Sequence, residues 1–337
     1  MQDQRINLDH GSGGKASHKL VADLFRRVFD NPALRPLEDC ALLDNPGGRL
    51  AFSTDSYVVD PIFFPGGDIG ELAVNGTVND LAMRGARPLY LSVGMILEEG
   101  LAMADLERIA LSMKRAADAA GVALVTGDTK VVPAGKADRI FINTAGIGVV
   151  EGDWRLSGAN ARVGDAILMS GSMADHGVTI LCRQQGLNIT GGFRSDTAPL
   201  YAMVAELLRA VGHDLRCLRD PTRGGVATTV NEIAAASGVG MEILEDRLVV
   251  RADVRGACEL LGLDPLYLAN EGKLLAFVEN SRAEEALAAI RRSPFGGEAA
   301  IIGRVVAEHP GRVYLKTKLG SKRLLDMLAG HPLPRIC

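Results

Sequence analysis

Aromatic residues and paired cysteines are scarce in this sequence of 337 residues. Aromatics make up 4% of it, which argues against the stacking of nucleic-acid bases as the main activity. The cysteines are odd in number and scattered, and they form no CxxC pair: Cys40, Cys182, Cys217, Cys258 and Cys337. The sequence therefore predicts neither a disulfide framework nor a zinc knuckle.

The sequence also lacks a strong excess of charge, a long apolar run and an export signal. The net charge of −4 and the pI of about 5.9 argue against a general nucleic-acid binder, which carries a basic face. No apolar stretch reaches the roughly 18 residues of a membrane span. Residues 1–5 lack the basic and apolar regions of a signal peptide. We expect a cytoplasmic protein without nucleic-acid or membrane partners.

Glycine is abundant, at 39 of 337 residues, against a usual share of about 7%. There is no G-X-Y period, so the excess does not indicate collagen. Length favours two domains, and alternating strand and helix patterns predict an α/β fold. A change of composition near 151–164 marks the boundary. We predict α/β domains at 1–155 and 156–307, followed by a tail at 308–337.

One glycine cluster, His10-Gly11-Ser12-Gly13-Gly14-Lys15, precedes a predicted helix. Backbone N–H groups at such a turn can hold an anion, and Lys15 can reach a phosphate. The cluster is not a P-loop, because Ala16 follows the lysine where that motif has serine or threonine. A glycine-rich helix entry without a ligand is the alternative.

Aspartates beside glycine, threonine or asparagine form a second group. Oxygen ligands from several loops suit Mg²⁺ with a nucleotide, whereas a single loop aspartate is more often a cap or turn residue. Asp80 lies inside an apolar helix, Asp128 follows an apolar strand, and Asp220 opens a helix. Lys130 and Glu271, at strand ends, suit either proton transfer or a surface salt bridge. The remaining aspartates of the group are Asp39, Asp44, Asp55, Asp60 and Asp68.

The last residues form the most unusual segment. Pro332 and Pro334 favour an extended chain, and seven residues can reach about 23 Å. Cys337 is the last residue, and a thiolate is the strongest side-chain nucleophile near neutral pH. The segment predicts an arm that carries a reactive thiol. A disordered tail that happens to end in cysteine is the alternative.

Eight motifs occur in the order found in one known family: HGSGG (10–14), TDS (54–56), FPGGDIG (64–70), GTVNDLA (76–82), TGDTK (126–130), DPTRGG (220–225), NEG (270–272) and PRIC (334–337). On these motifs, and over essentially the whole chain, the sequence resembles the HypE carbamoyl dehydratases. These belong with aminoimidazole ribonucleotide synthetase and selenophosphate synthetase in one superfamily. DPTRGG is shared by that superfamily, whereas PRIC is typical of HypE.

The resemblance implies a two-domain ATP-binding fold of the aminoimidazole ribonucleotide synthetase type, α/β (α+β), with a flexible C-terminal tail and a homodimer formed through N-terminal strands. It implies that the carbamoyltransferase HypF places a carbamoyl group on Cys337. ATP then phosphorylates the amide oxygen, and loss of phosphate leaves a thiocyanate. The cyanide passes to iron on the HypC–HypD complex, for the [NiFe]-hydrogenase centre.

The resemblance also implies roles for single residues. Cys337 carries the substrate, and Lys130 and Glu271 are the candidate bases. Mg²⁺ is expected on Asp39, Asp80 and Asp220, although the Glu38-Asp39-Cys40-Ala41 segment departs from relatives around Asp39. ATP is expected at Lys15, Asp55, Asn75, Asn79, Thr126, Gly127 and Asp128.

Two other functions are weighed against this one. A synthetase that phosphorylates a free small-molecule amide or selenide would need no tether. A non-catalytic carrier, in which Cys337 only accepts a group, would need no acidic loops for Mg²⁺ and ATP.

Overall fold

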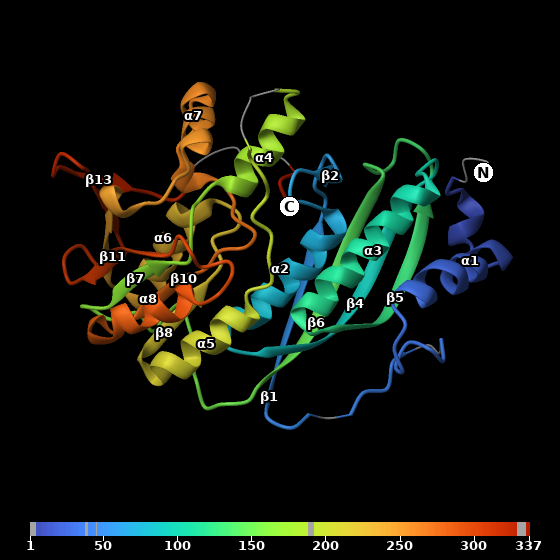
Figure 1. Ribbon diagram of the computed structural model, residues 1–337, viewed down its shortest axis with the longest axis horizontal. Coiled ribbons are helices and arrows are strands. Elements are labelled where there is room, and N and C mark those ends of the chain that lie inside the picture. Colours follow the sequence, from blue (N-terminus) through green and yellow to red (C-terminus); the bar gives the residue numbers. More distant parts are fainter. Residues whose placement is uncertain (1–4, 38–39, 45, 188–191, 329–334) are drawn as a thin grey trace.

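The computed structural model describes residues 5–37, 40–44, 46–187, 192–328 and 335–337 as two α/β domains (Figure 1). The strands are β1 (Arg49–Tyr57), β2 (Phe63–Phe64), β3 (Gly67–Asp68), β4 (Arg87–Glu98), β5 (Ala123–Val132), β6 (Ile140–Val150), β7 (Ala166–Met169), β8 (Leu215–Arg219), β9 (Gly240–Leu244), β10 (Leu275–Val278), β11 (Ala300–Val306), β12 (Val313–Lys316) and β13 (Lys322–Leu325). The α-helices are α1 (Lys15–Leu20), α2 (Ile69–Met83), α3 (Met103–Ala120), α4 (Asp175–Gln184), α5 (Tyr201–Val211), α6 (Gly225–Ser237), α7 (Ala252–Leu261) and α8 (Ala283–Arg291). A π-helical segment, η2 (Val21–Arg26), continues α1, and the 3-10 turns are η1 (Leu8–Gly11), η3 (Gly212–Asp214), η4 (Glu245–Arg247), η5 (Pro265–Tyr267) and η6 (Asn280–Arg282).

The N-terminal domain is a four-stranded sheet in the order β1-β6-β4-β5, with β4 and β5 parallel and the other pairs antiparallel. Helices α2 and α3 cover one face of this sheet, as Figure 1 shows. Ser53 faces α2, so its neighbours along β1 point to the other side. That uncovered face carries Leu50, Phe52 and Ile96, which are 61%, 71% and 43% exposed. A face this apolar indicates an interface.

Helix α2 is held close to its neighbours by its cap and its glycines. The Asp68 side chain caps the helix by accepting from the N–H groups of Gly70 and Glu71, so this loop aspartate is a cap residue. A Cβ on Gly70 would lie 2.7 Å from the carbonyl of Ile109 in α3. A Cβ on Gly76 would lie 2.1 Å from the Tyr57 hydroxyl. Part of the glycine excess therefore serves the packing of α2, the helix that carries Asp80.

The C-terminal domain is a seven-stranded sheet in the order β13-β12-β9-β11-β7-β10-β8. Consecutive side chains of β7 and β10 enter different cores, as expected for a sheet covered on both faces. Leu168 and Ala276 pack with α5 and α8, whereas Ile167 and Phe277 pack with α6. Of the described residues, no helix combines the length and apolar character that spanning a membrane requires.

The tail begins later in the structure than the sequence analysis placed it. Residues 313–316 pair in parallel with β9, and residues 322–325 pair with β12, so both strands extend the second sheet. Val313, Leu315 and Leu325 are buried in its core, an alternating pattern that the composition of the segment concealed. Figure 1 shows the C-terminus in the middle of the molecule, beside α4 and β2.

Candidate active site

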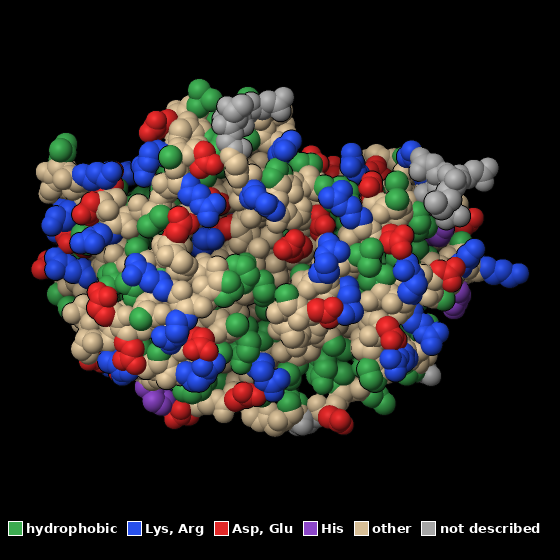
Figure 2. Space-filling view, in the orientation of Figure 1, with side chains coloured by type: hydrophobic (Ala, Val, Ile, Leu, Met, Phe, Trp, Pro, Cys, Tyr) green, Lys and Arg blue, Asp and Glu red, His purple; other side chains and the backbone are tan. Residues whose placement is uncertain are grey.

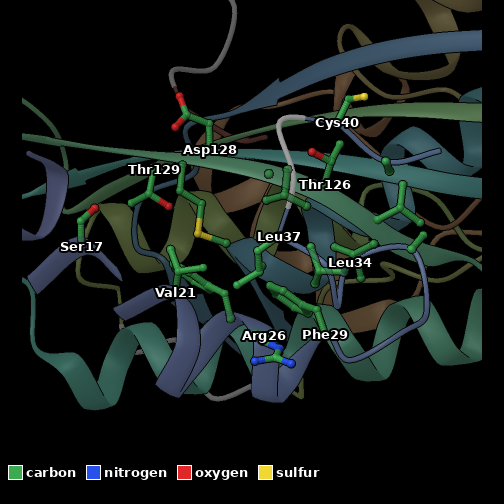
Figure 3. Close-up of a pocket in the computed structure, with 18 of the residues that line it drawn as sticks. Ser17, Val21, Arg26, Phe29, Leu34, Leu37, Cys40, Thr126, Asp128 and Thr129 are labelled. Atoms are coloured by element: carbon green, nitrogen blue, oxygen red, sulfur yellow. The ribbon is translucent and has the colours of Figure 1, made fainter. Parts of the chain in front are cut away.

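Two cavities flank the sheet of the N-terminal domain, at opposite edges. The first, of about 400 Å³, lies where β1 and α2 face the second domain, and it is called the thiol cavity because Cys337 lines it. The second, of about 340 Å³, lies at β5 beneath α1 and η2 and is called the apolar cavity (Figure 3).

Three aspartates from three segments line the thiol cavity: Asp55 of β1, Asp80 of α2 and Asp220 after β8. Ser53 Oγ donates to Asp80 Oδ2 over 2.7 Å. Burial raises the pKa of Asp80 above its usual value. Burial, with the charge of Asp80, raises the pKa of Asp220 to about 7. Carboxylates that repel one another in this way are suited to a bound cation.

Magnesium fits these residues only together with a nucleotide. Across the described ranges, no three His, Cys, Asp or Glu side chains converge closely enough to hold a metal ion. Mg²⁺ usually takes one or two carboxylates and fills its other positions with phosphate oxygens and water. Asp80 and Asp220 could supply the one or two carboxylate ligands that the protein provides in such a site.

Glu271 lies in the same cavity, on a turn that its neighbours fix. Its carboxylate is buried and Oε1 has no hydrogen-bond partner. Burial, with the charges of Asp196 and Asp220, raises the pKa of Glu271 well above its usual value. A Cβ on Gly272 would lie 1.8 Å from the carbonyl of Asp196, so this turn requires glycine. Asn270 donates from Nδ2 to the carbonyl of Pro221 over 2.9 Å and so ties the turns of Glu271 and Asp220 together.

The tail tip is docked beside these carboxylates. Val58 N–H donates to a backbone carboxylate oxygen of Cys337 over 3.1 Å, and Asp60 N–H donates to the carbonyl of Arg335 over 3.3 Å. Burial, with the charge of Glu271, raises the pKa of the Cys337 thiol to about 12. The docked thiol is therefore protonated at neutral pH and a poor nucleophile.

Arginines also line the thiol cavity, and the sequence analysis did not single them out: Arg84, Arg219 and Arg223. Arg223 lies within DPTRGG, so that motif carried a signal for it. Its charge acts against the rise in the pKa of both Glu271 and Cys337. Guanidinium groups in a cavity with carboxylates are suited to a phosphate that arrives with a metal ion.

The apolar cavity has a different lining. Figure 3 shows Val21, Leu34 and Leu37 gathered in its middle, with Thr126 and Asp128 at the rim formed by β5. Lys130 pairs with Asp128 over 2.9 Å at the surface. The hydrogen bond from Lys130 lowers the pKa of Asp128.

The strand register separates the two cavities. Asp55, Thr144, Val93 and Gly127 lie in one row across β1, β6, β4 and β5. Three strand spacings place Asp55 about 14 Å from Gly127. Asp128 and Lys130 therefore lie at the opposite edge of the sheet from Cys337 and Glu271 within one chain.

Comparisons with known proteins match both domains. The family descriptions "AIR synthase related protein, N-terminal domain" and "AIR synthase related protein, C-terminal domain" match residues 37–150 and 162–316. Carbamoyl dehydratase HypE of Azotobacter vinelandii is 54% identical over 332 residues, which cover 98% of this chain and 97% of that protein. The chain belongs to the HypE family of carbamoyl dehydratases.

Solved structures of the HypE family have the same fold. A crystal structure of HypE in complex with ATP is 58% identical, with a TM-score of 0.94, and the match covers 98% of this chain and 99% of that one. A crystal structure of a HypE–HypF complex is 46% identical, with a TM-score of 0.81, over 92% of this chain and 99% of that one. The two-domain fold of the aminoimidazole ribonucleotide synthetase type is confirmed.

The structure brings together five of the residues that the sequence analysis assigned: Asp55, Asp80, Asp220, Glu271 and Cys337. Thr126, Gly127 and Asp128 line the apolar cavity instead, and Lys130 lies next to them. Lys15 begins α1, between Gly13 and Ser17 of that cavity. Asp39 lies outside the described residues.

Asn75 and Asn79 lie in α2 and contact the second domain. Both are buried in α2 and contact the segment 192–200, which lies between α4 and α5 of the C-terminal domain. Asn75 Nδ2 donates to Thr197 Oγ1 over 3.1 Å, and Asn79 Oδ1 accepts from Leu200 N–H over 2.8 Å. These contacts join the domains, whereas Asn75 Oδ1 is buried without a hydrogen-bond partner.

Proposed function

We propose that this chain uses ATP to dehydrate a carbamoyl group on Cys337 to a thiocyanate. The observation that carries the proposal is the position of the Cys337 thiol, in one cavity with Glu271, Asp80 and Asp220. The family assignment supports the reaction class. A ligand for iron in [NiFe]-hydrogenase is the proposed use of the cyanide.

The reaction requires an activated oxygen and the removal of protons from nitrogen. The carbamoyl oxygen on Cys337 takes the γ-phosphoryl group, and ADP departs. The nitrogen loses two protons, the carbon–oxygen bond breaks, and the oxygen leaves with inorganic phosphate. Sulfur, carbon and nitrogen remain on the chain as thiocyanate, with no change of oxidation state.

Glu271 is the proposed base at this nitrogen. Its buried Oε1 lacks a hydrogen-bond partner, and a carboxylate with a raised pKa takes up a proton more readily at neutral pH. Lys130 is the second proposed proton-transfer group. The two lie at opposite edges of the sheet within one chain, so Lys130 has to come from a second copy.

A homodimer solves this separation. Strands β1 and β5 end the sheet, and the face with Leu50, Phe52 and Ile96 is open. If β1 of one copy lies beside β5 of the other, residues 126–130 of the second copy complete the thiol cavity of the first. A two-fold axis would form two such sites and cover both apolar faces.

ATP would then extend between the two cavities. We place its base among Val21, Leu34 and Leu37, and its phosphates near Thr126 and Asp128, with Lys15 close by. Asp80 and Asp220 would hold Mg²⁺, which neutralises phosphate charge when bound. Asp55 completes the acidic side of the cavity.

The tail has to leave the cavity to be loaded. The docked thiol is protonated and half-buried, so HypF would carbamoylate Cys337 in an undocked state. The loaded tail then docks for dehydration and undocks again to pass cyanide to the HypC–HypD iron complex. Because the cycle uses ATP, we place it in the cytoplasm.

Mass spectrometry tests this function. After incubation with HypF, carbamoyl phosphate and Mg²⁺-ATP, the C-terminal peptide should gain a carbamoyl group and then lose one water. Cys337→Ala should gain neither modification, while it still binds ATP. A stable carbamoyl group with ATP present would favour a carrier. ATP consumption by Cys337→Ala with a free amide or selenide would favour the synthetase.

A further inference from the structure

His176, in the first turn of α4, is a buried group that the proposed reaction does not use. Its side chain is 0% exposed, and its ring meets the edge of the Phe64 ring at 5.7 Å between centroids. Its Nε2 lies 2.7 Å from the carbonyl oxygen of Ile336, and its Nδ1 lies 2.8 Å from Ser195 Oγ. The ring therefore connects the tail with the segment 192–200 between α4 and α5.

The tail presents alternate carbonyls to opposite sides. The carbonyl of Arg335 and a carboxylate oxygen of Cys337 accept from the N–H groups of Asp60 and Val58, whereas the carbonyl of Ile336 faces α4 and meets His176. The Ile336 side chain is buried in the same apolar cluster as Phe64. A carbonyl buried at such a position needs a donor, because an unpaired one loses its hydrogen bond with water.

The partners fix the protons of the ring. A carbonyl only accepts, so Nε2 of His176 carries a proton and donates it to Ile336. Nδ1 then accepts from the Ser195 hydroxyl, whose oxygen accepts from Thr197 N–H over 3.2 Å. Burial lowers the pKa of His176 and so favours this neutral ring. Each donor in this series of hydrogen bonds, from Thr197 N–H through Ser195 and His176, therefore has an acceptor, and the series ends at the carbonyl of Ile336.

We propose that His176 is a positioning residue that docks the tail in the thiol cavity by holding the carbonyl of Ile336. Because Ile336 immediately precedes Cys337, this bond fixes the backbone from which the thiol reaches the cavity of Glu271. The role in dehydration rests on the proposed function, whereas the docking itself is a property of the free chain.

Two substitutions separate the bond from the bulk of the ring. His176→Gln can place an amide N–H where Nε2 lies and keep the donor to Ile336. His176→Asn is shorter, so it retains a polar contact with Ser195 but cannot reach the tail. Both replace the ring by an amide, which makes each the matched control of the other.

Alkylation of the full-length protein by iodoacetamide, without ATP, measures docking. The exposed Cys40 is the internal reference, and the C-terminal peptide is quantified by mass spectrometry. We expect Cys337 to react about tenfold faster in His176→Asn, which corresponds to about 1.4 kcal/mol, and within about twofold of wild type in His176→Gln. Equal rates in His176→Asn and wild type, or equal acceleration in both variants, would overturn the proposal.

Single-turnover dehydration extends the test. In His176→Asn, carbamoylation by HypF should not slow, because it uses the undocked tail, whereas loss of water should slow by the factor by which the docked fraction of the carbamoylated tail falls. Equal slowing of both steps would indicate a general structural defect and contradict the role. If carbamoylated Cys337 lost no water even in the wild type, the proposed function would be wrong. The alkylation rates would still test whether His176 docks the tail.

Ser195→Ala keeps the ring and covers the case in which His176→Asn does not fold. Without the Ser195 hydroxyl, nothing holds the proton on Nε2, so Cys337 should react about threefold faster with iodoacetamide. An unchanged rate in this folded variant would count against the chain of bonds from Thr197 to the tail.

Discussion

The thiol cavity and the apolar cavity are built in different ways. The thiol cavity draws its charged groups from β1, α2, the turns after β8 and before β10, and the end of the chain. The apolar cavity is lined mainly by residues 13–41 and by two adjacent strands of one domain. Contacts between distant segments place reactive groups at the junction of the domains, while a local stretch of chain shapes a cavity suited to recognition.

Charge distinguishes the two cavities as well. Burial raises the pKa values of Asp80, Asp220 and Glu271 in the thiol cavity, whereas Asp128 at the apolar cavity is exposed and has a lowered pKa. On the face in Figure 2, acidic and basic side chains are interspersed. The repulsion among acidic groups is therefore a local feature of the thiol cavity, where it favours a cation.

The largest expected effect tests whether the two cavities belong to one site across a dimer. Cys337→Ala and Asp128→Asn should each lose nearly all dehydration. A heterodimer of the two variants, purified through two different N-terminal tags, contains one intact composite site of two. It should recover about half of the wild-type rate.

The position of the product sharpens this result. Thiocyanate should form on the Asp128→Asn chain, which retains Cys337, and only when Cys337→Ala is its partner. Mass spectrometry of the C-terminal peptide detects it. A heterodimer as inactive as its parents would mean that Asp128 and Cys337 act within one chain, and the proposed dimer site would be wrong.

The convergence of Asp80, Asp220, Glu271 and Cys337 was predicted from sequence, but mainly through the resemblance. The residues alone left every loop aspartate open as a cap, and Asp68 is one. The separation of Asp128 from Cys337 depends on strand order, which non-local pairing determines. His176 gave no signal, because a lone histidine in an apolar helix is usually a core residue. Gly121 was recognised as the end of α3, and its φ of 69° confirms that local signal.

A charge inside the apolar cavity should weaken ATP binding without affecting the tail. Leu34→Asp places a carboxylate among apolar side chains where we locate the base. The KM for ATP should rise about tenfold, with kcat nearly unchanged, because the lost binding is shared by ground and transition states. Steady-state kinetics on carbamoylated protein measures both constants.

Leu111→Asp, on the exposed side of α3, is the matched control and should leave the KM unchanged. Iodoacetamide should alkylate Cys337 at the wild-type rate in both variants, because the thiol cavity is untouched. A lower kcat with an unaltered KM in Leu34→Asp would contradict the proposal that the nucleotide base of ATP binds in this cavity.

The smallest expected effect concerns stability and pH in the thiol cavity. The pKa of Asp220 is about 7 in the folded chain, against about 3.9 in an unfolded one, so the folded state binds more protons between these values. Stability without metal should therefore fall as pH rises from about 4 to 7, and the full penalty remains above pH 7. Asp220→Asn removes it, and should raise the free energy of unfolding by about 2 kcal/mol at pH 8 and by little at pH 4.

Urea unfolding at both pH values measures this difference, with the exposed Asp118→Asn on α3 as control. Asp220→Asn should also lose dehydration, because its amide cannot hold Mg²⁺ as a carboxylate does. Mg²⁺ with ATP should stabilise wild type at pH 8 more than Asp220→Asn, since only the wild type then gains a partner for its buried charge. A gain in stability of equal size at pH 4 and pH 8 would mean that packing, rather than the charge, opposes folding at Asp220. A gain confined to high pH, together with lost activity, would show that the thiol cavity retains a destabilising carboxylate because the reaction needs it.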